Sequence, residues 1–571
     1  MTDQAADLQP IARWKWGVLG VGPLAAALLF ALLPHESRSA AGELVGLSRD
    51  ARCVIAIGSL MALWWITEAV PLEATALLPI LLFPVLGIMD VKSTCAPFAD
   101  PTIFFFMGGM MMGAAMERWG LPRRFALIVL SRVGTSPRML VLGAMIATAI
   151  ISMWVNNTST TVMMLPIGLS IVRLFEQHGK RVEQDSGLRT EAFTQHAAPS
   201  TQHTPASGNL AVCMVLGIAY AATIGGIGTL FGTAPNIILQ SNISNLMHAE
   251  LSFFDYAKVG IPIMVLYLPV AWLVLIVMFP VPRSRDQGVH EQVRRELASL
   301  GPISGGERAV LIVLTTAVVL WVSTGSINEW IKARTGIERT LSEAGISIAA
   351  AVALFIWPVR TLLSKDKDSF TTESTEQEAP RTHSHSIQAQ FPHASPSSSV
   401  PPVPSVVNGL SVRVPALDWP TASSIHWGVL ILFGGGLSLA EAMSRTGVNT
   451  AVGSLFAHLK DMPLFLVVLG VTAIITMATE FASNTAIATT FLPIAYAGAI
   501  GLGVHPYVLM FPVALACSYA YMMPMGTPPN AMAVATGRVR IRHMVKAGLV
   551  LNIIAILLVS TYCYYVCPMI E

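Results

Sequence analysis

Long apolar runs without a single charge constrain this chain more than any other feature. The window from Thr102 to Met116 is one example, and only 12% of the 571 residues are charged, whereas soluble domains carry about 25%. A helix of roughly 20 apolar residues crosses the bilayer core of about 30 Å. The sequence therefore predicts an all-α polytopic membrane protein of the cell membrane. It excludes a disordered chain, a collagen-like chain and an ordinary soluble enzyme.

Charge and cysteine content exclude further classes. A net charge of +2 is too small to favour a nucleic-acid partner. The six cysteines are scattered through apolar segments without a CxxC pair or a metal-type spacing. We therefore expect buried thiols, no disulfide framework and no resident cofactor.

The apolar runs predict about eleven full crossings plus re-entrant segments. Residues 1–52 form an N-terminal segment with the first transmembrane helix, and its apolar run at 16–33 follows Arg13 and Lys15. That run is long for the core of a signal peptide, so a retained anchor helix is favoured over a cleaved leader. Two polar stretches, 176–208 and 364–416, cannot bury enough apolar surface to fold and are predicted to be disordered.

Four short motifs occur twice in the same order, which indicates an internal duplication. The polar insertions account for the changes in spacing between copies, which makes chance matching improbable. We therefore predict a first repeat at 53–281, a basic loop at 282–307 and a second repeat at 308–571. Such halves are typical of secondary transporters, and we expect an inverted topology. The pairs are 67–69 with 342–344, 106–109 with 432–435, 156–158 with 483–485, and 232–236 with 526–530.

The motif at Asn156-Asn157-Thr158 interrupts an apolar segment, and Ser483-Asn484-Thr485 does the same in the second repeat. A helix broken at membrane depth exposes backbone N–H groups and the positive end of its dipole, which favour an anion. Freed carbonyl, hydroxyl and amide oxygens suit a hard cation such as Na⁺. The alternative is that these side chains serve only as hydrogen-bonding contacts between helices.

The Gly-Thr-x-Pro-Asn motifs at 232–236 and 526–530 should be unwound turns, because proline cannot continue a helix. Irregular backbone at that depth must be buried or line a cavity. Neither the two asparagine motifs nor the two Gly-Thr-x-Pro-Asn motifs contain Lys or Arg. A buried dianion without a countercharge would be very costly, so we expect co-bound cations, although exchange against a second anion would also serve.

Two glycine-rich segments, 104–118 and 430–445, are short for a crossing. They predict either re-entrant hairpins with tight turns at the glycines or close helix packing through small residues. Carboxylates in or beside apolar runs are functional candidates by default. We expect Glu68 and Glu343 to be repeat mates, and we regard Glu480, beside the second motif, as the first to test. The other candidates are Glu73 and Glu117.

The segment Cys517–Ala533 resembles the signature of the divalent anion:sodium symporter (DASS, INDY-type) family, whose members carry di- and tricarboxylates or sulfate. Ser518, Pro524, Gly526 and Asn530 match it, whereas Tyr521 and Ala533 stand where we expect Phe and Val. Ser483-Asn484-Thr485 matches a paired family motif in full, and Asn156 replaces the first serine of the other copy.

The resemblance implies a fold with scaffold and transport domains, two re-entrant hairpins, an elevator motion and a homodimer. It implies two sodium sites and one site for a small dianionic substrate. The residues implied for substrate are Asn157, Thr158, Ser483, Asn484 and Thr485, helped by Thr527, Pro528 and Thr233. Those implied for sodium are Ser152, Asn156, Asn157 and Gly232 at one site, and Thr479, Ala482, Asn484 and Gly526 at the other.

The leading hypothesis is a sodium-coupled symporter of dicarboxylates of the succinate, malate and fumarate type, because paired half-helix sites suit two separated carboxylates. A Na⁺-independent dicarboxylate or citrate exchanger and a sulfate symporter are the alternatives on the same fold. An intramembrane enzyme is disfavoured because the sequence contains no HExxH or GxSxG motif. A membrane sensor would need a folded soluble domain, which neither polar stretch resembles.

Overall fold

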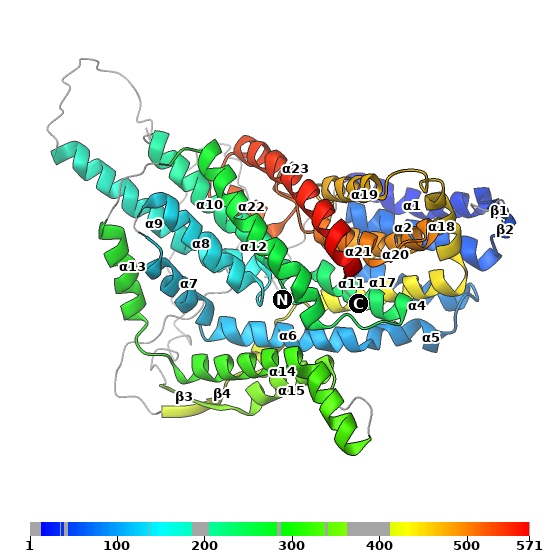
Figure 1. The fold of residues 1–571 in the computed structure, drawn as a ribbon, viewed down its shortest axis with the longest axis horizontal. Coiled ribbons are helices and arrows are strands. Elements are labelled where there is room, and N and C mark those ends of the chain that lie inside the picture. The colour runs from blue at the N-terminus through cyan, green and yellow to red at the C-terminus, as the bar shows by residue number, and fades with distance from the viewer. Residues whose placement is uncertain are drawn as a thin grey trace, which may run out of the picture.

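The computed structural model describes residues 13–34, 36–38, 44–134, 136–185, 205–281, 287–336, 341–362 and 411–569, and these are mainly helical (Figure 1). Within those ranges, ten helices are long and apolar enough to cross a membrane. This agrees with the polytopic helical fold expected from the apolar runs.

The helices and short strands follow one another along the whole described chain. The part before the first helix break contains α1 (Arg13–Leu32), β1 (Glu36–Arg38), β2 (Leu44–Gly46), α2 (Arg49–Thr67), α3 (Leu72–Ala76), α4 (Leu78–Val85), α5 (Val91–Cys95), η2 (Ala96–Ala99), α6 (Pro101–Arg118), α7 (Leu121–Arg132) and α8 (Pro137–Ser152). The middle contains α9 (Asn157–Asp185), α10 (Pro205–Gly226), α11 (Ala234–Met247), α12 (Phe253–Met278), α13 (Gln287–Ser299), α14 (Gly305–Thr335) and α15 (Glu343–Ile356). The last part contains β3 (Pro358–Leu362), β4 (Ser411–Pro415), α16 (Trp419–Ser423), α17 (Trp427–Arg445), α18 (Val448–Ala457), α19 (Leu464–Ala478), α20 (Asn484–Leu502), α21 (Tyr507–Ala516), α22 (Pro528–Ala535), α23 (Ile541–Val566) and η3 (Cys567–Met569).

The two halves of the described chain use helices in the same order. The repeated motifs pair each helix from α6 to α12 with its counterpart from α17 to α23. Helices α7 and α18 both follow a glycine with positive φ, Gly120 at 68° and Gly447 at 77°. Glycine adopts this conformation at little cost, so both copies keep it where the chain turns into the next helix.

The glycine-rich segments lie inside helices and do not turn the chain. Helices α6 and α17 run through Gly108 and Gly435 without a break. A Cβ on Gly108 would lie 2.6 Å from the Ser347 backbone, and one on Gly435 would lie 2.2 Å from the Ala76 carbonyl oxygen. The hairpin turns expected at these glycines are wrong, and the alternative of close packing holds. Each of these helices packs against a helix of the other half, since α6 contacts α15 and α17 contacts α3.

Three regions that composition predicted to be loops are partly ordered. Helix α9 continues to Asp185 and α10 begins at Pro205, so both ends of the 176–208 insertion are helical. Extending an existing helix costs less than nucleating a new one, which explains why polar residues follow α9. The rest of that insertion, 186–204, lies outside the described residues.

The linker predicted at 364–416 also ends in regular structure. Strand β4 pairs antiparallel with β3, with Arg360 opposite Arg413. Cross-strand pairing supplies the contacts that the polar composition alone did not reveal. Residues 363–410 lie outside the described residues.

The basic loop predicted at 282–307 contains helix α13, whose Val293 is buried. Arg124 of α7 holds the chain that follows this helix. Its Nε donates to Glu307 Oε1 at 2.6 Å, and its Nη1 donates to the Gly301 carbonyl at 2.8 Å. A buried guanidinium needs such partners, so this anchor gives the segment a fixed course.

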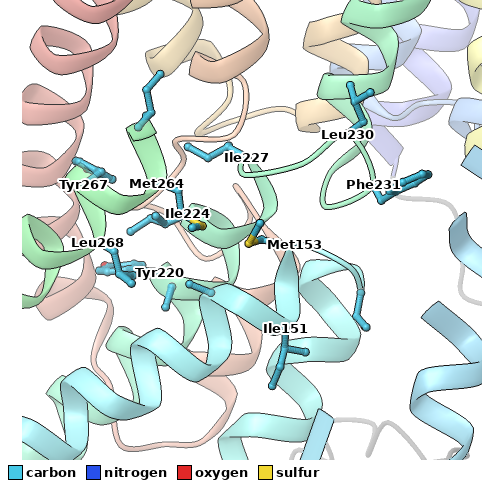
Figure 2. Packing of buried hydrophobic residues seen from close by; sticks show 14 of the residues in the cluster. Ile151, Met153, Tyr220, Ile224, Ile227, Leu230, Phe231, Met264, Tyr267 and Leu268 are labelled. Carbon is cyan, nitrogen blue, oxygen red and sulfur yellow. The ribbon is translucent and has the colours of Figure 1, made fainter. Parts of the chain in front are cut away.

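The core around α10 joins the two halves. Within the apolar stretch of helix α10, 89% of the residues are buried, and the helix packs against α8, α9 and α12. Figure 2 shows Tyr220 and Ile224 of α10 beside Met264 and Tyr267 of α12. Tyr220 donates to the Tyr521 carbonyl at 2.9 Å. Packing across the halves therefore fixes where the loop after α10 lies.

Candidate functional site

The helix breaks expected at the two asparagine motifs are present. Helix α8 ends at Ser152 and α9 begins at Asn157, whereas α19 ends at Ala478 and α20 begins at Asn484. The first turn of a helix has backbone N–H groups without intrahelical partners. Both motifs therefore present such groups at the start of a helix, as the sequence predicted.

In the first break, one hydroxyl group lies between two acceptors. Ser152 Oγ is 2.7 Å from Asn157 Oδ1 and 2.7 Å from the Ala222 carbonyl oxygen. A serine hydroxyl has one proton and can donate it to only one of these oxygens at a time. The group is rich in oxygen and short of protons, which is chemistry that suits a hard cation.

The second break repeats this arrangement with threonine. Thr479 Oγ1 is 2.6 Å from Asn484 Oδ1 and 2.8 Å from the Cys517 carbonyl oxygen. The asparagine follows the hydroxyl residue by five positions in both copies. The duplication has therefore preserved individual contacts as well as helix order.

Asn156 makes a different contact from Asn157. Its Oδ1 accepts a hydrogen bond of 2.8 Å from the Ser159 backbone N–H and caps helix α9. The corresponding Ser483 makes no such cap to α20. Replacing the family's serine by asparagine thus supplies a helix cap while leaving the amide group at the site.

Both Gly-Thr-x-Pro-Asn motifs are unwound turns, as expected. Thr233 precedes α11 and Thr527 precedes α22 as the N-cap residue. Asn236 Nδ2 donates to Gly226 O at 2.9 Å and to Thr229 O at 2.7 Å. Asn530 Nδ2 donates to Ala520 O at 2.8 Å and to Met523 O at 3.1 Å. Each asparagine thus ties the start of its helix to the chain segment that leads into the turn.

Close backbone approach explains the glycines of the first turn. A Cβ on Gly232 would lie 2.3 Å from the Gly226 carbonyl oxygen, and one on Gly226 would lie 2.6 Å from Asn157 Oδ1. A larger residue at Gly232 would require the backbone to move, and one at Gly226 would displace the Asn157 side chain. The turn is therefore pressed against the asparagine of the first break.

The side-chain oxygens of Asn236 and Asn530 were missed by sequence reasoning. Both residues are fully buried, and neither Oδ1 has a hydrogen-bond partner among the described residues. Buried polar atoms are rarely unpaired, so matched orphans in both repeats point to an additional ligand at each turn. Their place as the last residue of both Gly-Thr-x-Pro-Asn motifs was the signal that could have found them.

The two asparagine motifs and the two Gly-Thr-x-Pro-Asn turns meet at one cavity of about 670 Å³. Every residue implied for substrate lines it, although the two sets are 250 or more positions apart in sequence. Those residues are Asn157, Thr158, Thr233, Ser483, Asn484, Thr485, Thr527 and Pro528. The central expectation, that the two breaks face each other, is therefore confirmed.

The residues implied for sodium fall into two groups. Asn156, Gly232 and Gly526 line the cavity, as do the shared Asn157 and Asn484. Ser152, Thr479 and Ala482 are buried behind its wall. Both hydroxyl residues reach the cavity only through the asparagines that they contact.

The positive charge around the cavity comes mainly from backbone. Helices α9, α11, α20 and α22 each begin at the cavity, and their first residues line it. Helix N-termini carry partial positive charge and free N–H groups. No lysine or arginine stands among the described residues that line the cavity. An anion bound there would meet oriented dipoles instead of cationic side chains.

Residues 21–570 match the family model described as the sodium:sulfate symporter transmembrane region. The chain belongs to this family. It is a multi-pass membrane protein, as the resemblance of its motifs implied. The sodium-dependent dicarboxylate transporter SdcS of Staphylococcus saprophyticus is 31% identical over 551 residues, which is 96% of this chain and 90% of that one. SdcS of Staphylococcus aureus is 33% identical over 518 residues, 90% of this chain and 86% of that one.

A solved structure shares the fold at low sequence identity. MtrF of Neisseria gonorrhoeae, described as illuminating a class of antimetabolite efflux pumps, aligns with a TM-score of 0.52 and 12% identity. The alignment covers 98% of this chain and 96% of that one. This likeness concerns the fold alone.

Glu480 does not line the cavity but supports it from behind. The carboxylate is 1% exposed and accepts hydrogen bonds from the backbone N–H groups of Tyr521, Met522 and Met523 at 2.8–3.1 Å. Asn552 Nδ2 donates to it at 2.6 Å. These donors satisfy a buried carboxylate without a cation and hold the loop that leads into the second turn.

The other acidic residues have separate places. Glu68 and Glu117 line the cavity. Glu343 begins α15 and accepts from the Phe253 N–H at 2.7 Å, whereas Glu68 ends α2 with φ 48°. The pairing of Glu68 with Glu343 as repeat mates is therefore wrong, because one follows a helix and the other starts one. Glu73 packs against Gly428 at the start of α17.

Proposed function

We propose that this protein carries dicarboxylates of the succinate, malate and fumarate type across the membrane by symport with Na⁺. One observation supports this most directly: two matched helix breaks face one cavity that has no lysine or arginine among its described lining residues. The relatives named sodium-dependent dicarboxylate transporter agree with it.

The proposal assigns one substrate carboxylate to each break. Backbone N–H groups at the starts of α9 and α20, with the side chains of Asn157, Thr158, Asn484 and Thr485, would bind the two ends of the dianion. Two N-termini on opposite copies suit separated charges better than the single centre of sulfate. This favours a dicarboxylate over sulfate as the substrate.

Sodium would bind where acceptor oxygens outnumber the hydroxyl protons available to them. One ion would use Asn157 Oδ1 with the oxygens around Ser152 and the Gly232 turn, and the other would use Asn484 Oδ1 with those around Thr479 and the Gly526 turn. Each cation would displace a hydroxyl hydrogen bond and offset the negative charge of the substrate. Transport of the dianion then depends on co-bound cations because burying it alone is too costly.

The family resemblance extends the proposal to assembly and motion. We propose a homodimer in which a transport domain carrying the cavity moves against a scaffold. Crosslinking of the purified protein in lipid tests for the homodimer, and a monomer at all protein-to-lipid ratios would contradict it.

The experiment is uptake of labelled succinate by proteoliposomes that contain the purified full chain. An inward Na⁺ gradient should drive accumulation, and an equal K⁺ gradient should not. Equal rates in both gradients would reject symport and favour the exchanger, which unlabelled succinate inside the vesicles would then accelerate. A panel of succinate, citrate and sulfate at fixed Na⁺ distinguishes the substrate classes.

A further inference from the structure

Helix α6 contributes a carboxyl group to the cavity that the proposed symport does not use. Its cavity-lining residues recur at helical spacing, so they form one stripe on one face of the helix. Glu117 ends this stripe and is its charged member, one residue before the helix ends. The stripe consists of Phe106, Gly109, Met110, Gly113, Ala114 and Glu117.

The environment of Glu117 places its carboxylate beside the first substrate motif. It hydrogen-bonds to the side chain of Ser159, the residue that follows Thr158. The neighbouring guanidinium of Arg118 lies 2.9 Å from Asp418 Oδ1 and is engaged there. Among the described residues, Glu117 takes part in no ion pair.

Glu117 has no acidic counterpart in the second repeat. In the register set by the repeated motifs, Met443 corresponds to Glu117 and Ala486 corresponds to Ser159. Neither Met443 nor Ala486 lines the cavity, so the second repeat has no equivalent of this acid and hydroxyl there. A carboxyl group beside one asparagine motif, with no equivalent beside the other, indicates a role in recognition.

Size alone would not restrict the cavity to four-carbon substrates. Its volume of about 670 Å³ falls in the range of roughly 300–1,000 Å³ that holds drug-sized ligands. A tricarboxylate such as citrate is well below that size. Discrimination between a dianion and a trianion must then come from charge or from specific contacts.

We propose that Glu117 sets an upper limit on substrate charge by repelling a third carboxylate, an inference that rests on the proposed dicarboxylate transport. Helix α6 ends beside Glu117, and the negative end of its dipole adds to this repulsion. At the effective dielectric of a protein interior near water, one additional substrate charge several ångströms away lowers binding by about tenfold. His426 and Glu68 are the other titratable groups on the cavity wall.

The first test needs no variant, because it changes the charge of the ligand and not its size. Competition against labelled succinate is measured in the wild-type proteoliposomes with citrate, fully ionised, and with its monomethyl ester, a dianion of nearly equal volume. The ester should compete about tenfold better than citrate. Equal competition by both would overturn the inference.

The second test changes the protein. Glu117→Gln should raise the citrate-to-succinate uptake ratio about tenfold, and Glu117→Asp should restore discrimination. Glu441→Gln is the matched control. Glu441 lies near the end of α17, pairs with Arg445 and does not line the cavity, so this variant should leave the ratio unchanged. An unchanged ratio in Glu117→Gln would contradict the proposal.

The two proposals fail in different ways. If succinate uptake by the wild type is independent of Na⁺, the symport proposal fails whatever the ratio does. If uptake requires Na⁺ but neither the ester nor Glu117→Gln shifts selectivity, only the charge limit fails.

Discussion

The two half-sites share their contacts toward the cavity but differ in what supports them. Ser152 and Thr479 each contact an asparagine and a carbonyl oxygen with nearly the same distances. Behind the second break, Glu480 holds three successive backbone N–H groups, whereas behind the first the Met153 carbonyl accepts from Thr229.

The difference indicates which part of a duplicated site can diverge. The contact of a hydroxyl with an asparagine and a carbonyl oxygen is retained in both copies. The supporting contacts need only hold a loop in place, which a carboxylate with several N–H donors or a neutral hydroxyl can do. The two breaks therefore match in their hydroxyl–asparagine contacts, and we expect them to differ in their sensitivity to mutation.

The largest expected effect tests the asparagines that the two half-sites share. Asn484→Ala and Asn157→Ala should each reduce Na⁺-driven succinate uptake to background, because each removes an oxygen that faces substrate and cation. Asn209→Ala, which removes a contact to the Pro280 carbonyl away from the cavity, is the control. Uptake by Asn484→Ala at the wild-type rate, with normal expression, would contradict the site.

The next effect separates the two supports. Glu480→Gln should lower the free energy of unfolding by about 3 kcal/mol, because buried N–H donors lose a charged acceptor. Thr229→Val in the first half should cost about 1 kcal/mol, because it removes one neutral hydroxyl donor to the Met153 carbonyl. Chemical unfolding of the purified proteins in detergent measures both, and equal losses would show that the supports are equivalent.

The hydroxyl groups offer a finer comparison. Ser152→Ala and Thr479→Val should each raise the Na⁺ concentration for half-maximal uptake by about tenfold, since each removes one oxygen from a cation site. The exchanges Ser152→Thr and Thr479→Ser keep that oxygen and should stay near the wild-type value. If only one of the two hydroxyl deletions changes the Na⁺ dependence, the half-sites are not equivalent toward the cation.

The smallest effect concerns the linker between β3 and β4. Deleting residues 371–404 should change succinate uptake by less than about twofold, because that composition cannot form a core of its own. Uptake is measured under the same Na⁺ gradient as for the intact chain. A large loss would mean that the segment contributes to transport.

Sequence reasoning was accurate where structure depends on residues within one turn. Asparagine at 156–157 and 484 and proline at 235 and 528 act on their own backbone, so the helix breaks could be located in advance. It failed where partners are distant. The glycines of α6 pack against α15, and β4 pairs with β3 across a long linker, and neither partner is visible from local composition.

The role of Glu480 shows the same limit. A carboxylate in an apolar segment was correctly marked as unusual, but its partners at Tyr521–Met523 and Asn552 lie dozens of positions away. The unpaired oxygens of Asn236 and Asn530 likewise emerge only when all neighbours are in place.

The amino-acid order by itself determined that the chain spans a membrane, that it is duplicated and where its helices break. These properties follow from hydrophobicity, repetition and the local chemistry of Asn, Gly and Pro. Only the tertiary structure decided that both breaks open onto one cavity, which side of it carries a carboxylate and which residues support it. Such facts depend on packing between residues hundreds of positions apart, as in the bond from Tyr220 to Tyr521, and no local pattern encodes that packing.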